Sequence, residues 1–257
     1  MIDLHCHILP GLDDGPANVE ESLALARDAA AAGTSRVVAT PHVSERYSGT
    51  TALGIAMATL ELNRHLTAAG IDLRVIKGAE VALSRAPMLA DDELRRLRLG
   101  GGPWLLVECP TVTAGGAISA ALQRIADRGV RVLLAHAERI PAFQQDPALL
   151  EELVAGGMLC QVTAASLAGR FGQAERGFAE RLVGAGLVHV VASDAHSALH
   201  RRPCALPYLR EGGWAESWIA WWTRDVPGAL LAGDELPPPP VGPARREATP
   251  RSLKQRA

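Results

Sequence analysis

The sequence predicts an α/β protein built as a barrel of seven parallel strands. Two observations predict this fold: short apolar runs alternate with helix-type patterns, and chemically reactive residues follow nearly every apolar run. Alternating strands and helices build a parallel sheet. A barrel brings the carboxyl ends of all its strands to one mouth, whereas an open, doubly wound sheet has a single crevice. The recurrence of reactive residues therefore favours the barrel.

Seven apolar runs are the predicted strands, and five segments between them have the repeat of an amphipathic helix. The strands are expected near Ile2–His5, Arg36–Thr40, Leu73–Lys77, Trp104–Val107, Val130–Ala135, Met158–Val162 and Val188–Ala192. The helices are expected over Val19–Ala32, Gly54–Ala69, Ala117–Arg128, Pro147–Ala155 and Glu175–Ala185. Glycine follows four of these helices, as it often does at a helix C-terminus.

Composition and charge exclude several classes of protein. A chain of 257 residues can form one large domain, and an α/β barrel fits as one. The net charge of −2 gives no reason to expect a nucleic-acid partner. No apolar run reaches membrane-spanning length, so membrane insertion is not expected. The start lacks a signal-peptide pattern and the four cysteines lack disulfide or zinc spacing, so we expect a cytoplasmic protein.

The composition changes near the C-terminus. Pro237–Pro240 is a proline run, and the polar residues that follow carry five Arg or Lys against one acid, Glu247. We therefore expect residues 1–236 to form the barrel and residues 237–257 to form a proline-rich, basic and disordered tail. A solvated end is favoured over a docking role for this tail.

Nine histidine, aspartate and glutamate residues lie at or just after six of the predicted strands. One such residue at a strand end is usually a surface residue or a helix cap, but capping does not account for the whole set. Alternate residues of a strand share a face, so the two histidines of the first strand point the same way. The candidate metal ligands are His5, His7, Asp14, His42, Glu80, Glu108, His136, Asp194 and His196.

This donor set contains imidazoles and carboxylates but no thiolate, and it suits Mn, Fe or Zn in a hydrolytic centre. Nine donors are too many for one ion, so two or three divalent ions are expected. Glu80 or Asp194 could bridge two of them through its two carboxylate oxygens. Clustered ions lower the pKa of a shared water, which would then act as the nucleophile near neutral pH.

Two arginines suggest the substrate. Arg139 lies three residues after His136, and Arg201 lies seven residues after Asp194. A guanidinium group matches phosphate oxygens and keeps its charge at all physiological pH values. We therefore expect Arg139 and Arg201 to be the catalytic residues that bind a phosphate.

Five motifs, in order along residues 1 to about 233, resemble the polymerase and histidinol phosphatase (PHP) superfamily. They look most like its bacterial protein-tyrosine phosphatases from capsule and exopolysaccharide operons. The motifs are His5–Gly15, Ala39–His42, Gly78–Glu80, Ala135–Arg139 and Ser193–His196.

This resemblance implies a distorted seven-stranded barrel of the PHP, TIM-like type and a trinuclear centre. Manganese is the expected metal, with Fe, Zn, Mg and Co as other candidates. The implied reaction is hydrolysis of phosphotyrosine on the tail of a bacterial tyrosine autokinase or polysaccharide co-polymerase that controls polysaccharide synthesis. By motif, the ligand role falls on the nine residues above, with Asp14 rather than Asp13 as the matching acid. An oligomer is possible.

Other functions stay open. A PHP phosphatase could act on a small phosphomonoester such as histidinol phosphate. A non-catalytic, metal-bearing regulatory protein would have lost ligands or arginines, and none of the expected positions is missing. An amidohydrolase also carries His-x-His on a barrel, but its bridging lysine has no good candidate, because the lysines are Lys77 and Lys254.

Two further patterns are interpreted as structural. Cys204 and Arg210 match the Cys-x5-Arg spacing of cysteine-dependent tyrosine phosphatases, but the residues between them include Pro207 and no glycine. Such a phosphate loop needs free backbone N–H groups, so we do not expect one here.

Cys6 is expected in the core. The helically spaced tryptophans are expected to pack internally rather than to bind a partner; they are Trp214, Trp218, Trp221 and Trp222.

Overall fold

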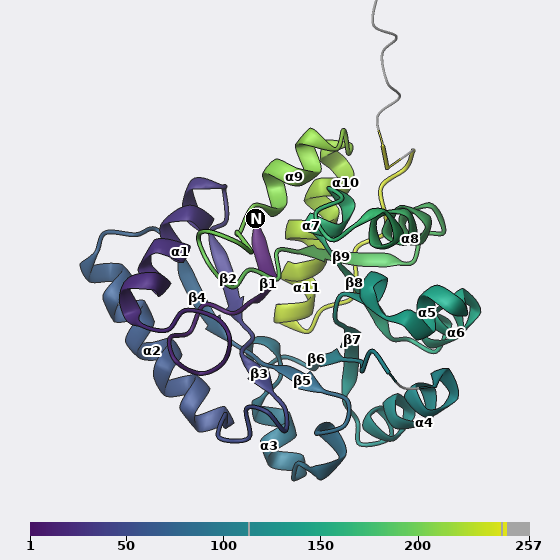
Figure 1. The fold of residues 1–257 in the computed structure, drawn as a ribbon, viewed down its shortest axis with the longest axis horizontal. Helices are drawn as coiled ribbons and strands as arrows, with labels where there is room; N and C mark the ends of the chain where they lie inside the picture. The colour runs from purple at the N-terminus through teal and green to yellow at the C-terminus, as the bar shows by residue number, and fades with distance from the viewer. Residues whose placement is uncertain (113, 243, 246–257) are drawn as a thin grey trace, which may run out of the picture.

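Parallel strands fill the centre of the molecule, which is described by a computed structural model for residues 1–112, 114–242 and 244–245 (Figure 1). All seven predicted strands are present, and two short strands, β3 and β5, were not predicted. The strands are β1 (Ile2–Cys6), β2 (Arg36–Ala39), β3 (His42–Val43), β4 (Arg74–Lys77), β5 (Glu80–Ala82), β6 (Trp104–Glu108), β7 (Arg131–Leu134), β8 (Leu159–Thr163) and β9 (Val188–Ala192).

Helices surround these strands (Figure 1). The five predicted helices are confirmed as α1 (Val19–Ala31), α2 (Ala52–Ala68), α4 (Gly115–Ala126), α6 (Pro147–Ala155) and α8 (Gln173–Gly184). Side chains of Asn18 and Thr51 cap α1 and α2 by accepting backbone N–H bonds. The shorter helical elements were not predicted: η1 (Ala86–Met88), α3 (Asp91–Arg96), η2 (Leu99–Gly101), η3 (Ala137–Arg139), α5 (Pro141–Gln145), α7 (Ala164–Leu167), α9 (Ala205–Glu211), α10 (Glu216–Ala220), η4 (Trp221–Asp225) and α11 (Val226–Ala232).

Within the described residues, no helix is both long and apolar enough to cross a lipid bilayer.

The strands form two parallel sheets, which confirms the predicted α/β fold, while closure into one barrel of seven strands stays a prediction. One sheet has the order β1-β2-β4, and the other has the order β3-β5-β6-β7-β8-β9. The division arises because β2 is interrupted by Thr40 and Pro41 before β3, and β4 is interrupted by Gly78 and Ala79 before β5. Pro41 has no N–H to continue a ladder. Beyond the strand ends, an isolated parallel bridge joins Cys6 to Ala195 next to β9.

Gly78 allows the chain to turn closely against β2 at this interruption. A β-carbon at residue 78 would lie 2.6 Å from Cγ1 of Val38 and 3.0 Å from Cδ2 of Leu99. After the interruption, His42 of β3 and Glu80 of β5 are direct partners across the two strands. This pairing keeps the register of β2 with β4 and sets two of the predicted ligands side by side.

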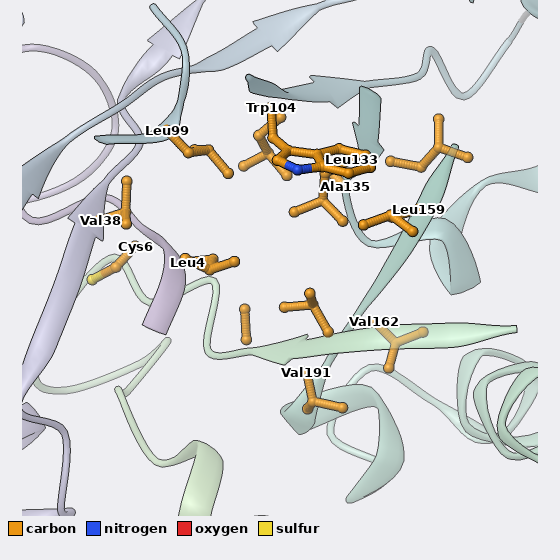
Figure 2. Packing of buried hydrophobic residues seen from close by; sticks show 14 of the residues in the cluster. Leu4, Cys6, Val38, Leu99, Trp104, Leu133, Ala135, Leu159, Val162 and Val191 are labelled. Atoms are coloured by element: carbon orange, nitrogen blue, oxygen red, sulfur yellow. The ribbon is translucent and has the colours of Figure 1, made fainter. Parts of the chain in front are cut away.

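The core is a single cluster of buried apolar side chains that joins both sheets to the helices. Figure 2 shows part of it, with side chains such as Leu4, Trp104 and Leu159. Cys6 is fully buried in this cluster, as predicted. The prediction of internal packing for the tryptophans is also confirmed, since Trp222 is fully buried and its Nε1 donates to the carbonyl of a β9 residue.

The described part of the proline-rich segment packs on these tryptophans. Nε1 of Trp221 donates to the carbonyl of Pro237 at 3.0 Å, and Nε1 of Trp218 donates to that of Gly242 at 3.1 Å. The structure thus corrects the prediction of disorder for these residues, because indole N–H groups find acceptors in the segment. The rest of the predicted basic tail, at 243 and 246–257, lies outside the described residues.

We predict that Gly78→Ala lowers the free energy of unfolding by about 1–3 kcal/mol, because the added methyl group overpacks the contact with Val38. The matched control is Gly177→Ala, inside α8, where a β-carbon meets no atom within 4 Å. This second change should raise stability by up to about 1 kcal/mol. Urea denaturation of both variants checks the pair, and equal stability of Gly78→Ala and the wild type would contradict the packing argument.

Candidate metal centre

The structure brings all nine predicted ligand residues together. They form four overlapping groups, and within each group the donor atoms lie within 4.8 Å of one another. The groups are His7, Asp14, His42 and His196; His5, His7 and Glu80; His5, His136 and Asp194; and His42, Glu80 and Glu108.

Glu80 lies at the centre of this cluster, and its side chain is fully buried. Its Oε2 atom is 3.3 Å from Nε2 of His5, 3.3 Å from Nε2 of His7 and 3.0 Å from Nδ1 of His42. Its Oε1 atom is 2.8 Å from Nε2 of His136. Oε2 makes no hydrogen bond with the described residues. A buried oxygen that faces three imidazoles without a hydrogen bond fits a carboxylate that bridges cations.

The imidazoles of His5 and His7 are oriented by acceptors behind them. Nδ1 of His7 donates to Oδ2 of Asp13 at 2.6 Å, and Nδ1 of His5 lies 3.1 Å from Oε1 of Gln161. With both Nδ1 protons held in this way, the two Nε2 atoms face each other at 3.2 Å. Such an outer hydrogen bond is typical of histidines that bind metals.

Asp194 connects the histidines to the two predicted phosphate-binding arginines. Its Oδ1 atom is 3.4 Å from Nε2 of His5, while its Oδ2 atom accepts from Arg139 at 2.6 Å and from Arg201. The Nε atoms of both arginines are buried and have no acceptor within the described part of the chain. A phosphate would offer oxygens to these donors.

Asp14 and Glu108 lie at the more open side of the cluster, with side chains 43% and 34% exposed. Asp14 Oδ1 is 3.5 Å from Nε2 of His42 and 3.4 Å from Nε2 of His196. Both acids line a cavity of about 330 Å³, together with both arginines. A small phosphate-bearing group can therefore reach the donor atoms from solvent.

The backbone is strained at two of the nine residues. His136 and Asp194 have φ values of 31° and 52°, and they are the non-glycine residues with positive φ in the described chain. Backbone strain of this kind is frequent at functional sites, where neighbouring contacts hold the residue in its unfavourable conformation. Around Asp194 these contacts are hydrogen bonds. The buried Asp3 accepts from the backbone N–H and the hydroxyl of Ser193, and the backbone N–H of Asp194 donates to the carbonyl of His5 at 2.9 Å.

Burial and neighbouring charges shift several pKa values. Burial opposes the charged form of His7, but its hydrogen bond to Asp13 and the negative charge of the nearby Glu80 outweigh this effect, and the pKa of His7 rises to about 10. Burial lowers the pKa of His136 to about 4, and the charge of Arg139 acts in the same direction. Burial raises the pKa of Glu108 to about 7. Cation binding would displace protons, above all from His7.

Asp13, Gln161 and Asp3 were not predicted as site residues. Asp13 accepts from the backbone of His42 as well as from His7, so it orients two donors without being in a ligand group. Gln161 and Asp3 are polar residues inside largely apolar strands, and that pattern could have revealed them. Asp13 carries the same chemistry as its neighbour Asp14, and the sequence alone cannot separate their roles.

The Cys-x5-Arg pattern is part of a helix, as expected for a pattern without catalytic meaning. Residues 205–211 form α9, in which the Tyr208 N–H donates to the carbonyl of Cys204 and Pro207 has no N–H, and Arg210 pairs with Glu216. Cys6, Cys109 and Cys160 are buried, and burial raises the pKa of the Cys109 thiol to about 12. None of these thiols is suited to be a nucleophile.

The fold and this site together define a class of α/β proteins. In this class, the ends of the strands carry imidazole and carboxylate groups that could hold several divalent cations. Residues 1–209 match the family model described as capsular polysaccharide synthesis, CpsB/CapC, and the chain belongs to this family.

Relatives and solved structures agree with this assignment. Tyrosine-protein phosphatase YwqE of Bacillus subtilis is 34% identical over 201 residues, which cover 78% of this chain and 79% of that protein. Tyrosine-protein phosphatase CpsB of Streptococcus pneumoniae is 29% identical over 216 residues, which cover 82% and 87%.

A crystal structure from a study of YwqE and CpsB, described as unique metal-dependent tyrosine phosphatases, aligns with a TM-score of 0.80 at 31% identity. The alignment covers 95% of this chain and 100% of that one. The phosphotriesterase of Mycobacterium tuberculosis shares the fold alone, with a TM-score of 0.56 at 15% identity over 90% of this chain and 93% of that one.

We predict that Asp13→Asn weakens Mn²⁺ binding about 10- to 100-fold, because the amide no longer holds His7 with its Nε2 toward the site. Asp72→Asn, a change of the same kind at an exposed residue, is the control and should leave binding unchanged. Isothermal titration with Mn²⁺ measures both. Wild-type affinity in Asp13→Asn would show that this hydrogen bond does not orient a ligand.

Proposed function

We propose that this protein is a metal-dependent phosphatase that hydrolyses phosphotyrosine in proteins. One observation carries the proposal: nine imidazole and carboxylate residues form one cluster in a member of the CpsB/CapC family, and six of them line a cavity together with two arginines. The relatives named tyrosine-protein phosphatases support it. The nine residues are the proposed ligands, and Arg139 and Arg201 the proposed phosphate-binding residues.

The proposed metal is manganese, in two or three sites. The donor set of histidines and carboxylates is compatible with it, although it also suits iron and zinc. The proposed substrate is the phosphotyrosine-bearing tail of a bacterial tyrosine kinase in capsule or exopolysaccharide synthesis. The family description, which concerns capsular polysaccharide synthesis, supports this choice.

The residues of the chain have separate tasks in this reaction. When bound, the divalent ions supply positive charge and a water of lowered pKa. Arg139 and Arg201 hold the phosphate oxygens, and Asp194 aligns both guanidinium groups through hydrogen bonds. Attack of a water oxygen on phosphorus would break the bond to the phenolic oxygen, and one proton of that water would pass to the departing phenolate, so that phosphate and tyrosine form. A phenol has a pKa near 10, so the phenolate leaves with little help from an acid.

We also propose that the two sheets are parts of one distorted, seven-stranded barrel, with β2 and β3 as one interrupted strand and β4 and β5 as another. The bridge between Cys6 and Ala195 supports closure between β1 and β9. A cytoplasmic location is proposed as well, since the four cysteines are free.

A small phosphomonoester is the rival substrate. With Mn²⁺ present, we expect kcat/KM for a phosphotyrosine peptide to exceed kcat/KM for histidinol phosphate by at least about tenfold. A tenfold ratio corresponds to about 1.4 kcal/mol of stronger binding in the transition state. Phosphate release measured with both substrates decides between them. Exhaustive chelation should abolish activity, and Mn²⁺ should restore it. Faster turnover of histidinol phosphate, or full activity after chelation, would overturn the proposal.

Replacement of either arginine should slow the reaction while metal binding is kept. We expect Arg139→Ala and Arg201→Ala each to lower kcat/KM about 100-fold or more, because donors to the transferring phosphoryl group are lost. Bound metal is measured in parallel by elemental analysis. Arg210→Ala and Cys204→Ser are the matched controls, and both should retain wild-type turnover. Full activity in both Arg139→Ala and Arg201→Ala would remove these residues from the mechanism.

A further inference from the structure

A second cavity adjoins the proposed catalytic centre. Its volume is about 370 Å³, and it shares two wall residues, Asp194 and Arg201, with the cavity of the metal centre. Its other walls include Phe171 and Tyr208, which are aromatic. None of the functions assigned above uses this cavity.

The walls of this cavity are strongly cationic. Arg170, Arg201, Arg202 and His200 line it, and Asp194 is the one acid among the lining residues. The Oδ2 atom of Asp194 already accepts from two arginines, so its charge is compensated. The cavity therefore favours a negatively charged occupant.

Arg170 is the cation best placed to bind such an occupant. Its guanidinium carbon lies 5.5 Å from the ring centre of Tyr208, so the ring supports the flat group while its N–H edges stay available. No carboxylate of the described chain lies within ion-pair distance of Arg170, whereas Arg202 pairs with Asp28 at 3.1 Å. Arg170 is exposed, lies against the ring of Tyr208 and thus has an unmet capacity for an anion.

We propose that this cavity is a subsite for an oxyanion that the substrate peptide carries beside its phosphotyrosine. The inference rests on the proposed function and adds sequence preference to it. With the phosphate held by Arg139 and Arg201, the flanking residues lie next to the shared wall, and each extended residue advances the chain by about 3.3 Å. An anionic side chain within a few residues of the phosphotyrosine can therefore reach Arg170.

Two chemical sources could supply this oxyanion: the carboxylate of an aspartate or glutamate, or the phosphate of a second phosphotyrosine. Three peptides of one sequence distinguish them. The first has a single phosphotyrosine with neutral neighbours, the second has glutamates beside it, and the third has a second phosphotyrosine beside it.

The test compares kcat/KM for these peptides in the Mn²⁺-loaded wild type, in Arg170→Gln and in Arg181→Gln. Arg181 is the matched control, because it is exposed and stacks on Phe178 at 4.9 Å but lines neither cavity. In the wild type and the control, an anionic peptide should be preferred over the neutral one by about three- to tenfold. The larger of the two preferences identifies the source.

In Arg170→Gln the preference should fall to about one, and Arg170→Lys should restore part of it. A wild type without preference, or a preference that survives Arg170→Gln, would overturn the subsite while the phosphatase activity stands. Lack of turnover with all three peptides would instead refute the proposed function, and the subsite with it.

Discussion

The burial of two carboxylates, Glu80 and Asp194, is the constraint on which the rest of the site depends. Both side chains are nearly or fully removed from water, and an uncompensated carboxylate in such a position is strongly destabilising. Burial alone would raise both pKa values, yet His5 and the other imidazoles hold that of Glu80 well below its usual range, and His5 with two arginines does the same for Asp194. The groups that make this burial possible are the same groups that can hold cations and phosphate.

The backbone brings these groups together from both ends of the chain. The strands β3 and β5 continue the register of β2 with β4 and pair His42 with Glu80, so that two donors stand on neighbouring strands at the same level. At the other end, hydrogen bonds join the backbone of His5 and His7 to Asp194 and Ala195. The parallel register, which is kept across the interruptions, and the backbone hydrogen bonds between the two ends of the chain therefore position the chemistry.

Seven of the strands and the clustering of the nine donors could be predicted because they depend on local patterns: apolar runs, glycine after helices, and ligand-type residues at six of the seven predicted strand ends. The orienting partners could not be predicted in the same way. Asp13 differs from Asp14 in the direction of its side chain alone, and Gln161 contacts His5 across the fold. The division into two sheets depends on the missing N–H of Pro41 and on the close contact at Gly78. The docking of Pro237 on Trp221 likewise depends on tertiary partners.

Charge balance links this donor set to its proposed substrate. Asp14, Glu80, Glu108 and Asp194 are four carboxylates in the ligand groups, and two guanidinium groups compensate half of their charge. A phosphotyrosine brings about two further negative charges at neutral pH. The remaining excess equals the charge of two divalent cations, and the five imidazoles can serve as neutral ligands without altering the balance. A single divalent cation would leave the phosphate in a field of excess negative charge, so charge balance favours the proposed multinuclear centre for the proposed substrate.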